Sequence, residues 1–283
     1  MHSIVMKILM TFIVALVAQC SLGQQYLLLN DLQRDYKVNK YTLKTQALYK
    51  VDKQIEIYNV FYKGLWGGYN YLCLISVLPD MNNDNSWEEI PKEVLENNLI
   101  KVDDIDKPNK NKFFNTFFLV RRENGIYYKA KNCLVEVFQL MNYPSKIHLN
   151  GNNIINIKQD VTTYGDVKEE VDKGAHFWKE EAPMENKGVF MSEIFKYIYL
   201  LGTEKKDKDT AYLFWTFTDW HKASGLNAHR GIDRFAYIEG KGIVAGSYDF
   251  YFDNTPNPYI YDIYTINMRI QIGRKLMWAE ELK

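Results

Sequence analysis

Cysteine clusters and N-glycosylation acceptors are missing from this sequence. Three cysteines in 283 residues exclude the class of small, disulfide-dense scaffolds. There is no Cys-x-x-Cys pair and no cluster of cysteine with histidine, so the sequence offers no structural zinc site. No Asn-x-Ser/Thr acceptor occurs either. We therefore expect a chain that folds without a metal ion or a cofactor.

The sequence also lacks an excess of charge of either sign. Lys and Arg together number 35, as do Asp and Glu, so the formal net charge is zero. A neutral chain without a basic block lacks the electrostatic signature of proteins that bind nucleic acid or anionic membranes. The densest charged run, residues 204–209, mixes both signs and is typical of a solvated loop.

The only long apolar run lies at the N-terminus, over residues 8–18, directly after Lys7. Eleven residues rise about 16 Å as a helix, which is roughly half the thickness of a bilayer core. Small residues, Ser21 and Gly23, follow the run. This order predicts a secretory signal peptide over residues 1–23, cleaved after Gly23 rather than kept as a transmembrane anchor.

Cleavage there leaves 283 − 23 = 260 residues, enough for one large domain or two small ones. We expect the mature protein to be secreted or periplasmic. Lipidation at Cys20 is an open alternative, although Gln19 stands where a lipid-attachment signal has a small residue. Two further cysteines, Cys73 and Cys133, lie in apolar runs. They could form a disulfide in an oxidising compartment or remain two buried thiols.

Strand signals dominate the remaining sequence. Residues 54–62 and 70–78 are β-rich runs joined by a glycine-containing connector, which indicates a hairpin. Asn124-Gly125 between two further runs is a strong hairpin signal. Helices are expected at 87–99 and 191–201, with a final helical turn at 276–282, although aromatic and branched residues leave a strand open at 191–201. Residues 146–149 and 154–157, on either side of Asn150-Gly151, are a second Asn-Gly hairpin candidate. Other strand candidates are 112–122, 126–130, 133–140, 211–220, 232–238, 242–252 and 259–272.

This pattern predicts a mainly β or α+β protein of antiparallel β-hairpins with two or three short helices. It forms a single large domain or two β-rich halves. We expect an N-terminal half over residues 24–160, a charged loop or linker over 161–188, and a C-terminal half over 189–283.

Aromatic residues make up 15% of the chain. Tyr and Trp can form a stacking platform for sugars or other flat ligands, although strand packing accounts for most buried rings. Trp66 and Trp220 are the best binding candidates, because both stand at expected strand ends beside loops.

The only compact set of catalytic residue types lies in the loop 219–233. Two histidines could act as base and electrophile while an aspartate orients one of them, or the set could hold a divalent metal. The spacing matches no diagnostic motif, so hydrogen-bonded loop side chains are the simpler interpretation. An arginine in the loop could bind an anionic group. The binding candidates are Trp66, Asp219, Trp220, His221, His229, Arg230 and Asp233.

The leading hypothesis from the sequence is an exported, non-catalytic β-rich protein that binds a ligand or acts as an accessory module. The ligand could be a small molecule or a carbohydrate. Two alternatives stay open: a secreted hydrolase or metal-dependent enzyme that uses the 219–233 loop, and an outer-membrane β-barrel.

Overall fold

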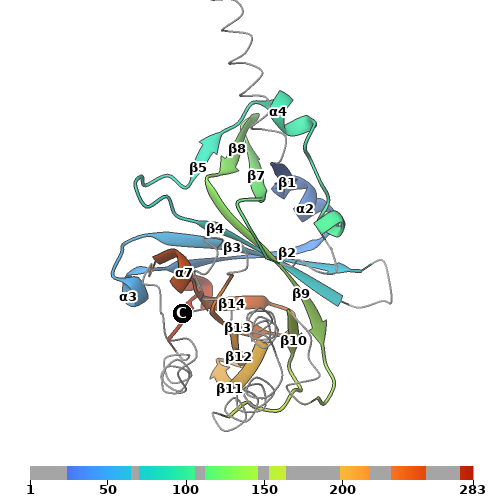
Figure 1. Cartoon of the computed structure of the whole chain (residues 1–283), viewed down its shortest axis with the longest axis vertical. Helices are drawn as coiled ribbons and strands as arrows, with labels where there is room; N and C mark the ends of the chain where they lie inside the picture. The colour runs from blue at the N-terminus through green and yellow to red at the C-terminus, as the bar shows by residue number, and fades with distance from the viewer. Residues whose placement is uncertain are drawn as a thin grey trace, which may run out of the picture.

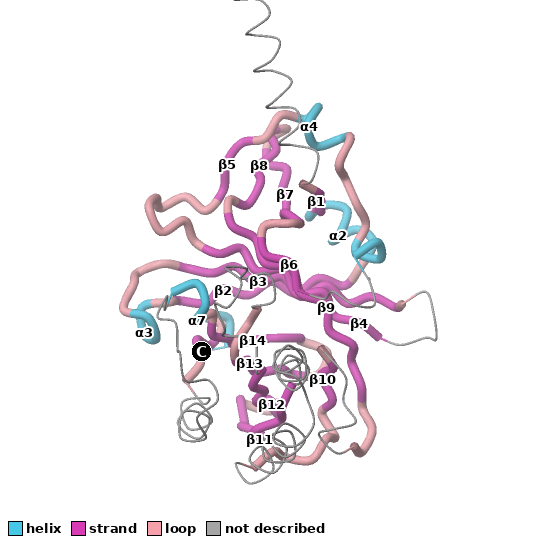
Figure 2. The backbone as a smooth tube through the Cα atoms, viewed as in Figure 1, coloured by secondary structure: helices cyan, strands magenta, loops and turns pink. Residues whose placement is uncertain are grey.

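Three β-sheets form the described part of the chain in the computed structural model, and they lie one above another as layers (Figure 1). The structure describes residues 24–64, 70–105, 112–145, 153–163, 198–216, 231–252 and 275–282. The expected signal peptide, Cys20 and most of the 161–188 segment lie outside these residues. Short helices connect the strands at the edges of the layers (Figure 2). The prediction of a β-rich, mainly antiparallel fold with a few short helices is confirmed.

The strands of the first and central sheets alternate along the chain, whereas the third sheet is built from consecutive strands. The first sheet has the order β1 (Gln25–Leu28), β7 (Phe117–Glu123), β8 (Ile126–Ala130), β5 (Trp87–Glu89). The central sheet has the order β10 (Ile154–Asn156), β9 (Asn132–Met141), β4 (Asn70–Leu78), β3 (Gln54–Lys63), β2 (Lys37–Lys44), with β6 (Lys112–Phe114) also paired to β9. The third sheet has the order β11 (Ile198–Lys206), β12 (Asp209–Thr216), β13 (Arg234–Ile238), β14 (Gly242–Ser247), β15 (Met277–Trp278).

Among these strands, only the pairs β1–β7 and β10–β9 run parallel. The helices of the described residues are short, and none is long and apolar enough to cross a bilayer. They are α2 (Leu29–Asp35), α3 (Gln46–Tyr49), α4 (Lys92–Glu96), α7 (Asp249–Phe252) and the 3-10 turns η1 (Val102–Ile105) and η5 (Glu280–Leu282).

The central sheet is buried on both faces, which explains why β4 is a nearly continuous apolar run. Alternate side chains of a strand point to opposite faces, so one apolar set cannot fill both cores. Cys73 and Ile75 pack in the core shared with the first sheet. Leu72 and Leu74 pack in the core shared with the third sheet.

Three buried polar side chains lie on the face of the central sheet that packs against the third sheet. Buried polar groups need hydrogen-bond partners, and these side chains find them across the interface. They therefore fix the position of the third sheet more specifically than apolar contact alone. Asn59 bonds both backbone groups of Ile243 (2.9 and 2.7 Å), Ser76 bonds the Tyr248 hydroxyl (2.8 Å), and the Glu136 carboxylate accepts the N–H of Ile232 (3.0 Å).

Two of the three hairpins expected in the N-terminal half are present. Of the third, the strand 146–149 lies outside the described residues, and β10 pairs parallel with β9. β3 and β4 pair antiparallel over their full length. β7 and β8 turn at Asn124-Gly125, whose φ angles of 51° and 86° are those that a two-residue hairpin turn requires. The expected strand 112–122 is broken at Asn115, which has a φ of 52°. At this break the chain leaves the central sheet and enters the first.

Several expected elements are placed differently. The helix expected at 191–201 is wrong for its described part, because Ile198 begins the strand β11, which pairs with β12. The strand expected over 242–252 ends at Ser247, and α7 follows. The helix expected at 87–99 is reduced to α4, because Pro91 precedes it and residues 87–89 form β5. In the 276–282 segment a strand, β15, precedes the helical turn η5.

Cys73 and Cys133 are both fully buried and free. They lie on the neighbouring strands β4 and β9, but Cys73 stands opposite Val137 and Cys133 stands opposite Val77. Four residues of offset separate them by about 13 Å along the strands, whereas a disulfide needs Cα atoms within about 7 Å. Of the two alternatives, the structure therefore has the free thiols. Burial raises the pKa of both, that of Cys133 to about 12, so neither is a reactive thiolate.

Candidate functional site

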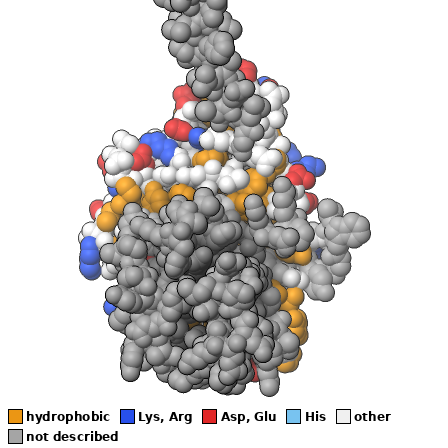
Figure 3. All heavy atoms as spheres, viewed as in Figure 1, with side chains coloured by type: hydrophobic (Ala, Val, Ile, Leu, Met, Phe, Trp, Pro, Cys, Tyr) orange, Lys and Arg blue, Asp and Glu red, His pale blue; other side chains and the backbone are white. Residues whose placement is uncertain are grey.

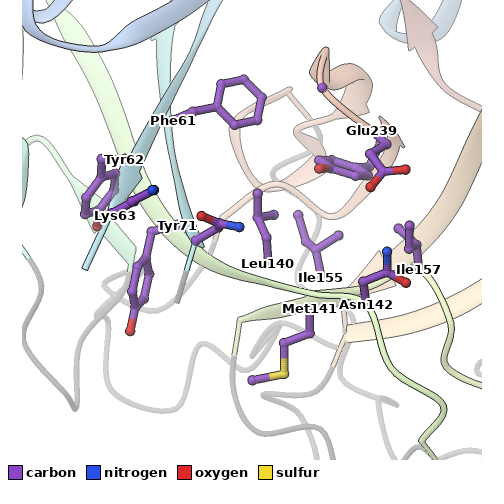
Figure 4. A pocket seen from close by; sticks show the side chains of 13 residues that line it. Phe61, Tyr62, Lys63, Tyr71, Leu140, Met141, Asn142, Ile155, Ile157 and Glu239 are labelled. Carbon is purple, nitrogen blue, oxygen red and sulfur yellow. The ribbon is translucent and has the colours of Figure 1, made fainter. Parts of the chain in front are cut away.

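A pocket of about 510 Å³ opens where the central and third sheets part (Figure 4). Its size is in the range of small-molecule sites. The lining comes from the end of β3, the start of β4, the end of β9, the strand β10 with the residue that follows it, and the turn after β13. Because these segments are far apart in the sequence, only the layered fold brings them together.

The apolar wall of the pocket is incompletely covered by the described residues. Phe61, Leu140 and Ile157 pack against the core between the two sheets but remain only partly buried. Ile155 and Tyr237 are buried beside them. Half-covered apolar surface next to a packed core is what an apolar ligand would bury, at roughly 25 cal/mol per Å².

Polar side chains stand around this apolar wall. Lys63 and Asn70 come from the paired ends of β3 and β4, while Asn142 follows β9 and Glu239 follows β13. In Figure 4, Lys63 lies on one side of the pocket and Glu239 on the other. Neither forms an ion pair with another described residue. The pocket therefore carries one charge of each sign beside an apolar centre.

Two stacked tyrosines border the pocket beside Lys63, and their rings pack with the core shared with the first sheet. The ring centroids of Tyr62 and Tyr71 are 5.4 Å apart, and their planes are inclined by 24°. The stacking needs the glycine at position 64, since a Cβ there would collide with the Tyr71 ring. The stacked rings thus fix the paired ends of β3 and β4, where Lys63 and Asn70 stand.

The turn after β13 is held in place by β2. The ammonium of Lys37 donates to the carbonyl of Gly240 at 2.6 Å, and the Asn39 amide donates to the carbonyl of Lys241 at 3.0 Å. Burial, followed by the charge of Glu239, raises the pKa of Tyr237 to about 12, so its hydroxyl stays protonated at neutral pH. The Glu239 side of the pocket is thus preorganised by contacts outside the pocket.

Of the binding candidates expected from the sequence, only Asp233 falls within the described residues, and it does not line the pocket. It forms hydrogen bonds with the start of α7 and with the backbone of Thr216 and Ser247, none of which lines the pocket. The others stay predictions that the described residues do not test: Trp66, Asp219, Trp220, His221, His229 and Arg230.

Asp233 belongs to a buried polar cluster that holds α7. Its carboxylate accepts the backbone N–H of Asp249, the first residue of α7, at 2.5 Å. The Asp249 carboxylate in turn accepts bonds from Tyr49 (2.7 Å) and Arg234 (3.1 Å). Burial, with the nearby carboxylates, raises the pKa of the Tyr49 hydroxyl far above its usual value. These contacts give Asp233 a structural role, because they cap a helix that would otherwise start with a free N–H.

Sequence reasoning missed Lys63, Asn70 and Glu239. The signals that could have found them were present, because the β3–β4 connector and the 239–242 turn both follow expected strand ends, where ligands tend to bind.

In the described segments, no group of three or more His, Cys, Asp or Glu side chains is arranged to hold a metal ion. Comparisons of the chain with models of protein families, with curated proteins and with solved structures found no match.

Proposed function

We propose that this chain is an exported, non-catalytic protein that binds a small ligand in the pocket between its central and third sheets. The observation that carries the proposal is the partly covered apolar wall of Phe61, Leu140 and Ile157 beside unpaired polar groups. Export is supported by the signal-peptide pattern of residues 1–23. Secretion or periplasmic location is part of the same proposal.

A binding role fits the lining better than a catalytic one. The described lining contains Lys63 and Glu239, but no histidine, cysteine, serine or aspartate. Nucleophilic or acid–base catalysis needs paired groups within hydrogen-bond reach, and these two charges lie on opposite sides of the pocket (Figure 4). On the face shown in Figure 3, acidic and basic side chains of the described residues are interspersed, which supports a small ligand over a highly charged polymer.

The pocket can be tested with the fluorescent apolar probe 8-anilinonaphthalene-1-sulfonate. We expect saturable binding of one probe per mature protein, because a single concave apolar wall would enclose it. Leu140→Asn should weaken the binding by about tenfold or more, since it removes apolar area and places a carboxamide beside the naphthalene ring without adding a charge that would attract the sulfonate. Circular dichroism would check that the variant retains its strands.

The matched control is Ile126→Asn, which places the same side chain at an exposed position of β8 in the first sheet. This variant should bind the probe like the parent protein. Probe binding that is unsaturable, or that both asparagine variants reduce equally, would rule out the pocket as the binding site.

A further inference from the structure

The charges of the pocket are separated by its apolar part. Lys63 is the last residue of β3, and Glu239 directly follows the last residue of β13. Figure 4 shows Leu140 and Ile155 between these two residues. A ligand that lies along the pocket therefore meets a cation, then an apolar wall, then a carboxylate.

Besides its tyrosines, the described lining contains two uncharged polar side chains, and both are carboxamides. Asn70 is the residue paired with Lys63 across β3 and β4. In Figure 4, Asn142 lies on the opposite side of the pocket, with Glu239. Neither side-chain amide has a hydrogen-bond partner among the described residues. A carboxamide both donates and accepts hydrogen bonds, as a peptide group does, so two of them can pair with backbone amides of a ligand.

We infer that the ligand class is a short apolar peptide with free termini, its carboxylate toward Lys63 and its ammonium toward Glu239; this rests on the proposed function. An amphiphile with one charge would leave either Lys63 or Glu239 unmatched, and a neutral sugar would leave both unmatched. Another cation lies nearby, Lys37, but its ammonium is directed to the Gly240 carbonyl and lies 5.2 Å from the centroid of the Phe61 ring.

The expected contribution of each charge is modest, because Lys63 and Glu239 are both exposed. Exposed ion pairs change affinity by about two- to fivefold. The apolar middle of the peptide supplies the remaining affinity through burial on the pocket wall. The charges therefore set the orientation of the peptide more than the strength of binding.

The experiment is calorimetric titration of the mature protein with the peptide Leu-Ala-Leu in four forms: free, N-acetylated, C-amidated and blocked at both ends. We expect the free peptide to bind tightest. Each single block should weaken binding by about two- to fivefold, and the double block by about the product of the two effects.

Two variants assign each terminus to its partner. In Glu239→Gln, N-acetylation should no longer weaken binding, while C-amidation still does. In Lys63→Gln the pattern should reverse. Both positions are exposed, so the fold should survive, and the control Glu89→Gln removes an exposed carboxylate from β5 in the first sheet without changing either pattern.

The possible failures are distinguishable. If all four peptides bind equally, or if none binds while the naphthalene sulfonate probe still does, the peptide inference is wrong and the pocket remains a binding site. If N-acetylation and C-amidation weaken binding to the parent protein, but also weaken it equally in Glu239→Gln and Lys63→Gln, the assigned orientation of the peptide is wrong. If neither the probe nor any peptide binds, the proposed function itself fails.

Discussion

The Asn59 side chain makes the two hydrogen bonds to Ile243 that the backbone of a neighbouring strand would otherwise make. Its carboxamide donates to the carbonyl of Ile243 and accepts the N–H of the same residue, so it satisfies both backbone groups at a point inside the core. The bond crosses 184 positions of the sequence and joins the central sheet to β14. The third sheet, and with it the Glu239 side of the pocket, depends on this contact.

We expect Asn59→Ala to lower the free energy of unfolding by about 2–4 kcal/mol, because two buried backbone groups lose their partner. Urea denaturation followed by circular dichroism would measure it. Asn39→Ala is the control and should cost less than about 1 kcal/mol, since the carbonyls it contacts also receive bonds from Lys37 and Tyr41. Equal losses in the two variants would contradict a special role for Asn59.

At the residue scale, the sequence shows that a side chain is polar but not what it will contact. Asn59 stands in the run 54–62, which was identified as a strand, yet its partner Ile243 could not be named from spacing. Asp233 was a reasonable catalytic candidate by residue type. It caps α7 instead, because the fold buries it next to the N–H of Asp249.

The hairpin turns allow a comparison at the element scale. Gly125 and Gly242 both have positive φ angles, 86° and 92°, in turns between antiparallel strands. A Cβ at position 125 would meet nothing within 4 Å, whereas a Cβ at position 242 would collide with the Asn59 side chain. An alanine would therefore suffer the same unfavourable φ angle at both positions, but its Cβ would collide with a neighbouring side chain only at position 242.

Gly125→Ala should cost about 1 kcal/mol, the penalty of a positive φ in a residue with a side chain. Gly242→Ala should cost roughly 1–3 kcal/mol more, because it also displaces Asn59 from Ile243. Thermal and urea unfolding of the two variants would measure the difference. If the two substitutions cost the same, the close packing of the 239–242 turn against β3 would be refuted.

Elements governed by local chemistry could be predicted, and those governed by distant contacts could not. Asn124-Gly125 specifies its own hairpin. The strand β11 was expected as a helix because its apolar spacing suits both, and only pairing with β12 decides between them. The helix α7 interrupts an expected strand, since the cap that starts it comes from Asp233, outside the segment.

At the scale of the whole molecule, the stacking of three sheets follows from the central strands. A run such as β4, apolar on both faces, must be covered on both sides, so a sheet alone or a two-layer sandwich would leave half of it exposed. The apolar run of β4 shows in the sequence that both faces of this strand must be covered, but it does not show which sheets cover them. The pocket lies where the described residues cover the ends of the central strands incompletely, and that depends on strand lengths across several segments of the chain.

The layers bury many tyrosines, which makes the molecule sensitive to alkali. Burial is the main cause of a raised pKa for Tyr26, Tyr36, Tyr41, Tyr49, Tyr58, Tyr237, Tyr248 and Tyr251. An unfolded tyrosine ionises near pH 10, so above that pH the unfolded state binds fewer protons than the folded state. The stabilisation is therefore complete below pH 10 and is lost as the pH rises from about 10 to 12 and beyond.

For Tyr237, whose pKa is raised to about 12 and which is only 4% exposed, this predicts a loss of roughly 2–3 kcal/mol between pH 10 and 12. Urea midpoints measured from pH 8 to 11.5, with tyrosinate absorbance at 295 nm, would test it. Unfolding should coincide with the ionisation of these eight tyrosines, which are eight of the 21 in the chain. Tyr237→Phe should reduce the slope of stability against pH by about one proton. Complete tyrosine ionisation near pH 10 in a protein that stays folded would show that these rings are not shielded from solvent.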